Sequence, residues 1–464
     1  MKRNLLYLCL FSSFFGLASL LVACETEELG SGFDPGDDEA IEEEEDQEEE
    51  DPGFSGDIDS LVTFGGSDED EAVSVIEVAG GFVVGGRTRS TDGDLTGRTG
   101  DDWDYWVIRL DTEGNRLWQQ TYGGSADERL ASLSATSDGG FILSGYSRSS
   151  DGDVGANEGF HDFWIVKIDA QGGIDWERNF GYVGSDQAFD VLETTDGGYL
   201  ATGFLDVDAS GGEGNDDRAA QHGVGDFWAV KMDAEGEWIW RRYFGGTNND
   251  RASQALELED GNYLLFGSSE SDDFDITDSK GSYDFWAVKV TPLGEKIWTR
   301  SYGGSQIDIG NAACISNNGN ILLTGDVRSA DGDISDPLGN ADIWIAEIDP
   351  NGNLIKERTL GGTAFESARD IYAFDDGILV VGSTRSTDGD VQQGLGENDA
   401  WIVWLNNDGT IAFQRTVGGS SFDFGEAVIP TNDRGLLMVG HTESEDGDVV
   451  QQRGKKDLMV VKFK

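Results

Sequence analysis

Pairs of aspartates that flank a glycine recur along the sequence, and their spacing resembles a cation site. The motif is Ser-x-Asp-Gly-Asp, with phenylalanine replacing the glycine in one copy. Two carboxylates on either side of a turn can point oxygens at one hard cation such as Ca²⁺. Asp-Gly is also an ordinary turn former, so a purely structural turn is the alternative interpretation. The pairs are Asp92 and Asp94, Asp151 and Asp153, Asp273 and Asp275, Asp331 and Asp333, Asp388 and Asp390, and Asp446 and Asp448.

A second series of acids stands four residues after the second position of each Gly-Gly-like pair. Its members are Asp70, Glu128, Asp186, Asp250, Asp308, Glu366 and Asp423. If the chain brings them into one ring, seven carboxylates predict a site for a hard cation. The alternative is that each carboxylate accepts backbone N–H bonds within its own turn, and a feature present in every copy favours this structural role.

Two places depart from the repeated pattern and are candidates for ligand specificity, because loops tolerate change and carry function. The third copy lacks Asp-Gly-Asp and has a longer loop, which a tolerated surface insertion also explains. Trp103, an aromatic residue without repeated counterparts, could stack on a sugar ring or shield a turn. The candidate residues of the longer loop are Asp206, Asp208, Asp216, Asp217, Arg218 and His222.

The elements that position these residues are seven copies of one repeat. The leading glycine of each copy is Gly65, Gly123, Gly181, Gly245, Gly303, Gly361 or Gly418. Within a copy, short β-branched and aromatic runs alternate with Gly, Asp and Ser clusters, and no segment shows sustained helical periodicity. Four strands per copy predict the blades of a β-propeller.

The two ends of the repeat region predict how the ring closes. The last copy stops after its third strand, at 458–463, and the missing fourth strand precedes the first glycine, at 58–64. The N-terminal strand would then complete the last blade and remove an open sheet edge. The sequence therefore predicts an all-β, seven-bladed propeller over residues 58–464, with the second series of acids at one mouth of its central channel.

One tryptophan in each of six copies follows the first residue of the third strand by two positions. These residues are Trp106, Trp164, Trp228, Trp286, Trp344 and Trp401, and Met459 takes the place in the last copy. Large rings at a repeated strand position are expected to pack between adjacent blades.

The residues from Thr121-Tyr-Gly-Gly-Ser-Ala-Asp to Asp138-Gly-Gly-Phe-Ile-Leu-Ser-Gly-Tyr-Ser-Arg-Ser resemble the SBBP type of bacterial β-propeller repeat. The resemblance recurs in all seven copies and implies the propeller fold. It implies little about function, because members are mostly uncharacterised exported proteins. The sequence departs from that repeat by following the second strand with Asp-Gly-Asp where Phe-Pro is typical.

The N-terminus predicts export. Lys2 and Arg3 precede an apolar run that ends in Leu21-Val22-Ala23-Cys24, the order of a secretory signal over residues 1–23. The last four residues resemble the lipobox of bacterial lipoproteins, which implies cleavage before Cys24 and diacylation of its thiol; an uncleaved membrane helix is the alternative. Residues 24–57 are rich in Glu and Asp and predict a disordered linker. Acids after the cysteine resemble the surface-export signal of Bacteroidota lipoproteins, so we expect an outer-membrane lipoprotein, surface-exposed or periplasm-facing.

The net charge and the absence of known catalytic motifs exclude several classes of function. The formal net charge is −58, and the residues after 57 still carry 73 acids against 30 bases, so a nucleic-acid partner is not expected. The three histidines are scattered, and no zinc motif, nucleophile elbow or phosphate loop is present. We expect a lipid-anchored binding or scaffold module for a glycan or a protein, with Ca²⁺ as the one candidate cofactor. The alternative is a propeller enzyme that acts on polysaccharide through two carboxylates.

Overall fold

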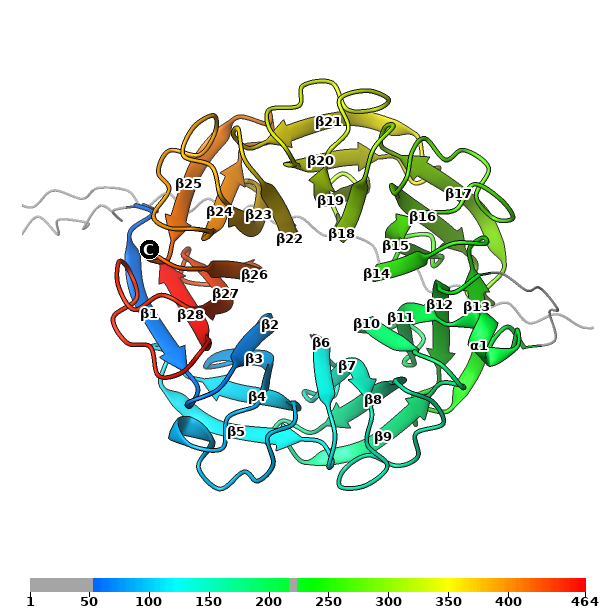
Figure 1. Ribbon diagram of the computed structural model, residues 1–464, viewed down its shortest axis with the longest axis horizontal. Coiled ribbons are helices and arrows are strands. Elements are labelled where there is room, and N and C mark those ends of the chain that lie inside the picture. The colour runs from blue at the N-terminus through cyan, green and yellow to red at the C-terminus, as the bar shows by residue number, and fades with distance from the viewer. Residues whose placement is uncertain (1–52, 217–222) are drawn as a thin grey trace, which may run out of the picture. The chain divides into compact units, whose positions relative to one another are not determined.

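The computed structural model describes residues 53–216 and 223–464. The predicted signal segment, Cys24 and nearly all of the predicted linker lie outside the described residues. The described chain forms seven four-stranded antiparallel sheets arranged as blades around a central channel (Figure 1). The predicted fold class is confirmed. Strands a to d denote the innermost to the outermost strand of a blade.

The first three blades follow one another along the chain. Blade 1 contains β2 (Asp70–Val78), β3 (Gly81–Thr88), β4 (Asp104–Leu110) and β5 (Arg116–Tyr122). Blade 2 contains β6 (Glu128–Ala135), β7 (Phe141–Ser147), β8 (Asp162–Ile168) and β9 (Ile174–Phe180). Blade 3 contains β10 (Gln187–Glu193), β11 (Tyr199–Leu205), β12 (Asp226–Met232) and β13 (Trp238–Phe244).

The next three blades repeat this order. Blade 4 contains β14 (Asp250–Glu257), β15 (Tyr263–Ser269), β16 (Asp284–Val290) and β17 (Lys296–Tyr302). Blade 5 contains β18 (Asp308–Ile315), β19 (Ile321–Val327), β20 (Asp342–Ile348) and β21 (Leu354–Leu360). Blade 6 contains β22 (Glu366–Phe374), β23 (Gly377–Thr384), β24 (Asp399–Leu405) and β25 (Ile411–Val417).

The seventh blade joins the two ends of the repeat region, as the sequence predicts. It contains β26 (Asp423–Pro430), β27 (Leu436–Thr442) and β28 (Asp457–Phe463), and its outermost strand is the N-terminal β1 (Ile58–Phe64). Strand β1 pairs antiparallel with β28, from Ile58 opposite Phe463 to Phe64 opposite Leu458. The ring therefore has no open edge between its first and last strands.

Ordered structure begins before β1, inside the stretch that the sequence assigned to the linker. Phe54 packs against the rings of Trp404 and Phe413, with centroid distances of 5.4 and 5.1 Å. The N–H groups of Ser55 and Gly56 both donate to the carbonyl oxygen of Lys464 at 2.9 Å. The predicted boundary at residue 58 is therefore a few residues too late, because an aromatic side chain buries itself against blade 6.

The core lies between blades, and the predicted tryptophan packing is confirmed. All six strand-c tryptophans, and Met459 in blade 7, are fully buried. Each of four tryptophans meets an aromatic ring of the preceding blade; Trp228 lies 4.6 Å from Phe163, and Trp286 lies 4.5 Å from Phe227. Aromatic rings that bury about 200 Å² each, here in edge-to-face contacts, supply much of the energy that holds neighbouring blades together.

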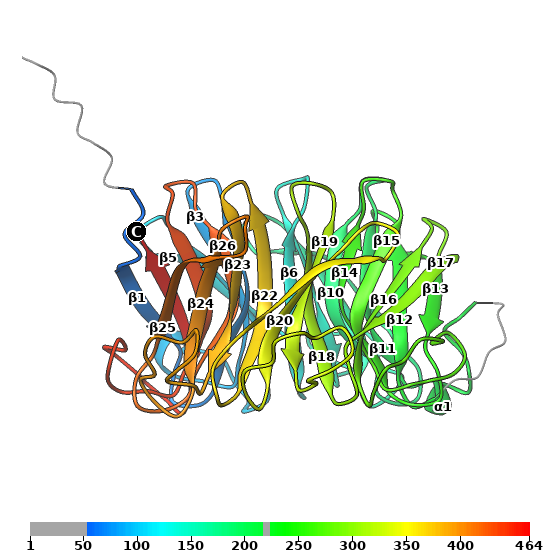
Figure 2. The ribbon, with the colours of Figure 1, turned by 90° about the horizontal axis from the view of Figure 1, so that it is seen from above.

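The two faces of the disc differ (Figure 2). The a–b and c–d turns are short, whereas the b–c loops are long and emerge on the opposite face, here called the b–c face. The two described helices, the 3₁₀ turn Gly93–Leu95 and α1 (Val207–Ser210), both lie in b–c loops. In residues 53–216 and 223–464, no helix combines the length and apolar character that a bilayer crossing requires.

Candidate functional site

The Asp-Gly-Asp loops close onto the turn that precedes the innermost strand of their own blade. In blade 2, Asp151 accepts the N–H of Ser125 at 2.8 Å, and Asp153 accepts the N–H of Gly123 at 3.2 Å. The N–H of Asp153 donates back to the carbonyl oxygen of Gly123 at 2.9 Å. Each pair thus fastens a b–c loop to a turn. The same bonds are made by Asp92 and Asp94, Asp273 and Asp275, Asp331 and Asp333, Asp388 and Asp390, and Asp446 and Asp448.

We expect Ca²⁺ to leave the stability of the propeller unchanged. Both carboxylates of each pair already accept backbone N–H bonds, and among the described residues no three His, Cys, Asp or Glu side chains are placed to share an ion. The measurement is thermal unfolding in EDTA, in Mg²⁺ and in Ca²⁺. A cation at 100 times its Kd would add about 2.7 kcal/mol per site. A rise in Tm with Ca²⁺ that Mg²⁺ does not reproduce would show that the loops are calcium sites after all.

The acids at the start of the innermost strands point into their own blades. Asp250 is fully buried and accepts the N–H of Gly246 at 2.7 Å and the hydroxyls of Ser269 and Ser271 at 2.5 and 2.9 Å. The predicted ring of carboxylates at a channel mouth is therefore wrong, because the turn N–H groups and strand-b hydroxyls draw these side chains away from the channel. Corresponding bonds to the preceding turn hold Asp70, Glu128, Asp186, Asp308, Glu366 and Asp423.

These acids meet a second buried carboxyl group from the preceding blade. The aspartate that begins each strand c lies beside the first glycine of the next turn; a Cβ on Gly123 would lie 2.1 Å from Asp104 Oδ1 and 2.9 Å from Glu128 Oε2. Only glycine leaves room there. Burial raises the pKa of Asp104 to about 6 although Arg98 opposes it, and burial raises the pKa of Asp186 to about 7. Buried carboxyl groups thus form a belt between blades, where they have a structural role and are not part of a surface site.

The longer loop of blade 3 builds local structure in its described part. Asp206 caps α1 by accepting the N–H of Ala209 at 3.0 Å, and the Asp206 N–H donates to Asp186 at 2.9 Å. Asp208 is exposed, and Asp216 forms ion pairs with Arg241 and Arg242. A ligand-binding role for this loop stays a prediction, and its remaining candidates, Asp217, Arg218 and His222, lie outside the described residues.

Trp103 does not offer a ring to a sugar, so that interpretation is wrong. Its side chain is only 3% exposed. Three guanidinium groups cover the ring, with distances to its centroid of 4.9 Å for Arg129, 5.7 Å for Arg87 and 6.0 Å for Arg89. Cation–π contact holds an arginine in place without using its N–H donors. Trp103 therefore packs against the arginines. Two of them, Arg87 and Arg129, line the channel.

The site that the sequence did not reveal lies in the channel. Each innermost strand contains a β-bulge at the same position, and a bulge re-aims a side chain. The seven extra residues are Val73, Ala131, Phe189, Ser253, Asn311, Arg369 and Glu426. All seven line one cavity of about 640 Å³, within the size range of ligand pockets. No two are alike in a chain whose other positions repeat, so this ring distinguishes the blades.

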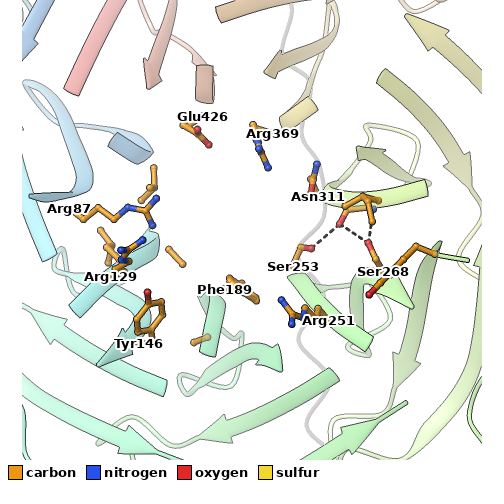
Figure 3. Close-up of a pocket in the computed structure, with 17 residues that line it drawn as sticks. Arg87, Arg129, Tyr146, Phe189, Arg251, Ser253, Ser268, Asn311, Arg369 and Glu426 are labelled. Carbon is orange, nitrogen blue, oxygen red and sulfur yellow. Dashed lines mark hydrogen bonds between the residues drawn. The ribbon is translucent and has the colours of Figure 1, made fainter. Parts of the chain in front are cut away.

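Four arginines line this cavity against a single carboxylate, Glu426 (Figure 3). Arg129 and Arg251 are the second residues of β6 and β14, Arg369 is the bulge residue of β22, and Arg87 lies near the end of β3. Arg87, Arg129 and Arg251 therefore lie at the strand ends nearest the b–c face, and Arg369 lies further along its strand. The four come from blades 1, 2, 4 and 6, so they surround the cavity instead of forming one patch.

Three of these arginines keep their N–H donors for a ligand. Arg129 stands on Trp103, and Arg251 stands 4.6 Å from the centroid of Phe204. Within residues 53–216 and 223–464, the side chains of Arg129, Arg251 and Arg369 have no hydrogen-bond or ion-pair partner. The buried Nε of Arg129 is an unsatisfied donor. Buried polar groups are normally paired, and an anion in the cavity would supply the partner that Arg129 lacks within the protein.

Arg87 is the exception, because it is already neutralised. Its Nε donates to Glu71 at 2.6 Å, and Lys456 approaches the same carboxylate at 2.7 Å. Although burial opposes ionisation, these cations and their bonds lower the pKa of Glu71 to about 2. Burial raises the pKa of Glu426, with Arg369 and Arg87 opposing it. The cavity therefore keeps a positive balance at neutral pH.

Two acids deeper in the channel tie blades together. Asp190 accepts the hydroxyl of Ser132 at 2.8 Å and the N–H of Ala255 at 3.0 Å, from the blades on either side. Asp370 accepts the N–H of Val428 at 3.0 Å. Burial raises the pKa of both, to about 6 for Asp370. These hydrogen bonds link neighbouring blades in the channel wall. The bonds explain why acids occur at this depth without assigning them a catalytic role.

Fold and site together define a seven-bladed β-propeller with an arginine-lined channel. No protein-family model matches the chain, and no curated protein sequence matches it. Among solved structures, a protein proposed to be a 6-phosphogluconolactonase from Bacteroides fragilis is 14% identical, with a TM-score of 0.40, over 75% of this chain and 85% of that one.

Two fungal structures are similar to the same degree. Sqt1 from Chaetomium thermophilum is 11% identical, with a TM-score of 0.41, over 82% of this chain and 83% of that one. The Pan2 WD40 domain of Neurospora crassa is 10% identical, with a TM-score of 0.44, over 88% and 89% of the two chains. At such identities and TM-scores these likenesses carry no argument about ligand or activity.

Proposed function

We propose that this protein is a binding module whose ligand is anionic and enters the central channel from the b–c face. The observation that carries the proposal is the set of three arginines, Arg129, Arg251 and Arg369, that line one cavity without protein partners among the described residues. Guanidinium groups bind carboxylate, sulfate and phosphate oxygens through paired N–H donors, so they select for anions with such groups.

The cavity is positively charged, whereas the rest of the chain is strongly negative. Acids outnumber bases 90 to 32, so a random group of five charged residues would be mostly acidic. The cavity reverses that ratio, with four arginines and one glutamate. A positive, partly desolvated cavity inside a negative disc attracts anions at short range, while the outer surface repels polyanions that cannot fit the channel.

Binding is better supported than polysaccharide cleavage. Glycoside hydrolysis needs two carboxyl groups placed on either side of the scissile bond. Glu426 is the one carboxylate lining the main cavity, and the nearest deeper candidates, Asp190 and Asp370, accept backbone N–H bonds. Among the described residues the site therefore has the parts for holding an anion and lacks a free carboxylate pair.

The test is calorimetric titration of the full-length protein with citrate, inorganic sulfate and galacturonate. We expect at least one of these probes to bind, more weakly as ionic strength rises. We expect Arg251→Ala and Arg369→Ala each to lower the affinity ten- to hundredfold, since a hydrogen bond to a charged group contributes about 1.5–3 kcal/mol.

The matched control is Arg300→Ala, from the same blade as Arg251. Arg300 lies on the outermost strand β17, is exposed, and donates only to the backbone oxygen of Thr299. It removes the same charge at a distance from the channel. An equal loss of affinity in this control, or no binding of any probe to the unmodified protein, would overturn the proposal.

We also propose that the propeller is exported and held at a membrane by lipid on Cys24. The support is the sequence alone: the basic start, the apolar run and Leu21-Val22-Ala23-Cys24. The acidic segment after Cys24 would then join the lipid anchor to the propeller. The mass of the N-terminal peptide of the mature protein decides it, since a diacylated Cys24 supports the anchor and an intact Met1 contradicts it.

A further inference from the structure

Blade 2 carries an aromatic track that leads out of the arginine-lined cavity. Tyr146 lines the cavity, and its ring lies 4.5 Å from the ring of His161. The ring of His161 lies 4.3 Å from that of Phe160, which is 56% exposed on the b–c face. Three consecutive rings thus connect the inside of the channel with the outer surface.

Cationic groups accompany the track along its length. Arg129 lines the cavity beside Tyr146 (Figure 3). At the outer end, the guanidinium of Arg148 lies 4.4 Å from the centroid of Phe160 and 3.4 Å from Asp127. The track therefore offers aromatic surface and guanidinium donors at both ends.

The middle ring is fixed and neutral. His161 Nδ1 lies 2.8 Å from the hydroxyl of Ser185 and 3.1 Å from the side-chain amide of Gln187. Burial, with the nearby Arg148, lowers the pKa of His161 to about 4. At neutral pH the ring is therefore uncharged.

The track belongs to one blade only. The positions of Tyr146 and His161 are occupied by Ser268 and Tyr283 in blade 4, and by Asp326 and Ala341 in blade 5. The propeller fold does not require the three rings, because no other blade carries rings at all three equivalent positions. A packing role explains buried rings, but it does not explain why Phe160 remains more than half exposed.

We propose that the ligand is an acidic oligosaccharide chain, with one acidic sugar among the channel arginines and the following sugars along the Tyr146–His161–Phe160 track. This inference rests on the anion-binding function proposed above and names its ligand class. A pyranose ring presents an apolar C–H face that stacks on aromatic rings, while its carboxylate or sulfate group meets a guanidinium. A small free anion would bind in the channel without contacting the aromatic track.

The experiment compares oligogalacturonates of one, two, four and six units in titrations of the full-length protein. We expect the affinity to rise at least tenfold between the monomer and the tetramer. Phe160→Ala should remove most of that gain and leave the affinity for the monomer within twofold. The matched control is Phe274→Ala, since Phe274 is 58% exposed on the same face in blade 4, and it should change neither affinity.

The outcomes separate this inference from the function on which it rests. If the monomer binds and Arg251→Ala abolishes binding, but affinity does not grow with chain length or Phe160→Ala has no effect, the track is not a subsite and the channel proposal stands. If hexaglutamate shows the same length gain and the same dependence on Phe160, the ligand is an acidic peptide and the glycan assignment is wrong. If no anion binds, both proposals fail.

Discussion

Deleting residues 58–64, which form β1, should abolish the folded monomer. The strand is the fourth strand of blade 7 and pairs with β28 along its length. Phe64 also enters the apolar cluster between blades 7 and 1. Without β1, the backbone donors and acceptors of β28 become an open sheet edge, and the chain ends no longer hold the ring closed. Size-exclusion chromatography and circular dichroism should show aggregated or unfolded protein.

The control for this deletion removes residues 25–51, most of the predicted linker, and leaves Phe54 and β1 intact. This variant should still elute as a monomer and keep the Tm of the full-length protein. A monomer with unchanged Tm after deletion of β1 would contradict the account, because it would mean that the contacts between blades 7 and 1 alone close the ring.

Mild acidification should stabilise the protein. Burial raises the pKa of Asp104, Asp162 and Asp457 to about 6, and that of Asp186 to about 7. Unfolded aspartates titrate near 3.9, so between pH 5 and pH 7 the native state binds more protons than the unfolded state. The free energy of unfolding then falls as pH rises, by less than about 1.4 kcal/mol per group and pH unit, because each native carboxyl group is only partly protonated within the window and is still screened by solvent. We expect a higher Tm at pH 5 than at pH 8.

Two histidines oppose this trend. Burial lowers the pKa of His161 to about 4 and that of His441 to about 3. Below pH 6.5 these histidines are therefore protonated in the unfolded state but not in the native state, which lowers the free energy of unfolding. The carboxyl groups with raised pKa values outnumber these two histidines, so stabilisation on acidification should prevail. The fall in net negative charge on acidification also stabilises the folded state. Measuring Tm at pH 8 in high salt separates general repulsion, which salt screens, from the buried carboxyl groups. A Tm that falls steadily from pH 8 to pH 5 would contradict the account.

The fold could be predicted because each of the seven copies repeats the same pattern of strands and glycine turns. The glycine pairs, the strand-c tryptophans and the split last copy each depend on local spacing, and repetition removes the ambiguity of any single copy. The N-terminal boundary of the propeller could not be read from the sequence. Phe54 sits in an acidic, glycine-rich stretch that has the composition of a linker, and only the groove beside Trp404 and Phe413 gives it a partner.

The repeated acids were the wrong place to look for the site. Asp250 and its equivalents recur because every blade needs a buried acceptor for the same turn, which is a structural demand. The side chains that line the cavity vary between blades: the second residue of the innermost strand is Arg129 or Arg251 in two blades, and Gln187, Ile309 or Phe424 in others. Aligning the seven copies and marking their most variable inner-strand positions would have pointed to this ring, although the bulge that turns Arg369 and Glu426 inward has no signature in the sequence.

The most direct test of the account is a crystal structure of the protein soaked in selenate, whose anomalous signal locates an anion without ambiguity. We expect a peak inside the channel, within hydrogen-bond distance of at least two of Arg129, Arg251 and Arg369, and we expect this peak to be lost in Arg251→Ala. Peaks confined to the outer surface, with a channel that stays empty at a concentration where titration shows binding, would contradict the assignment of the site.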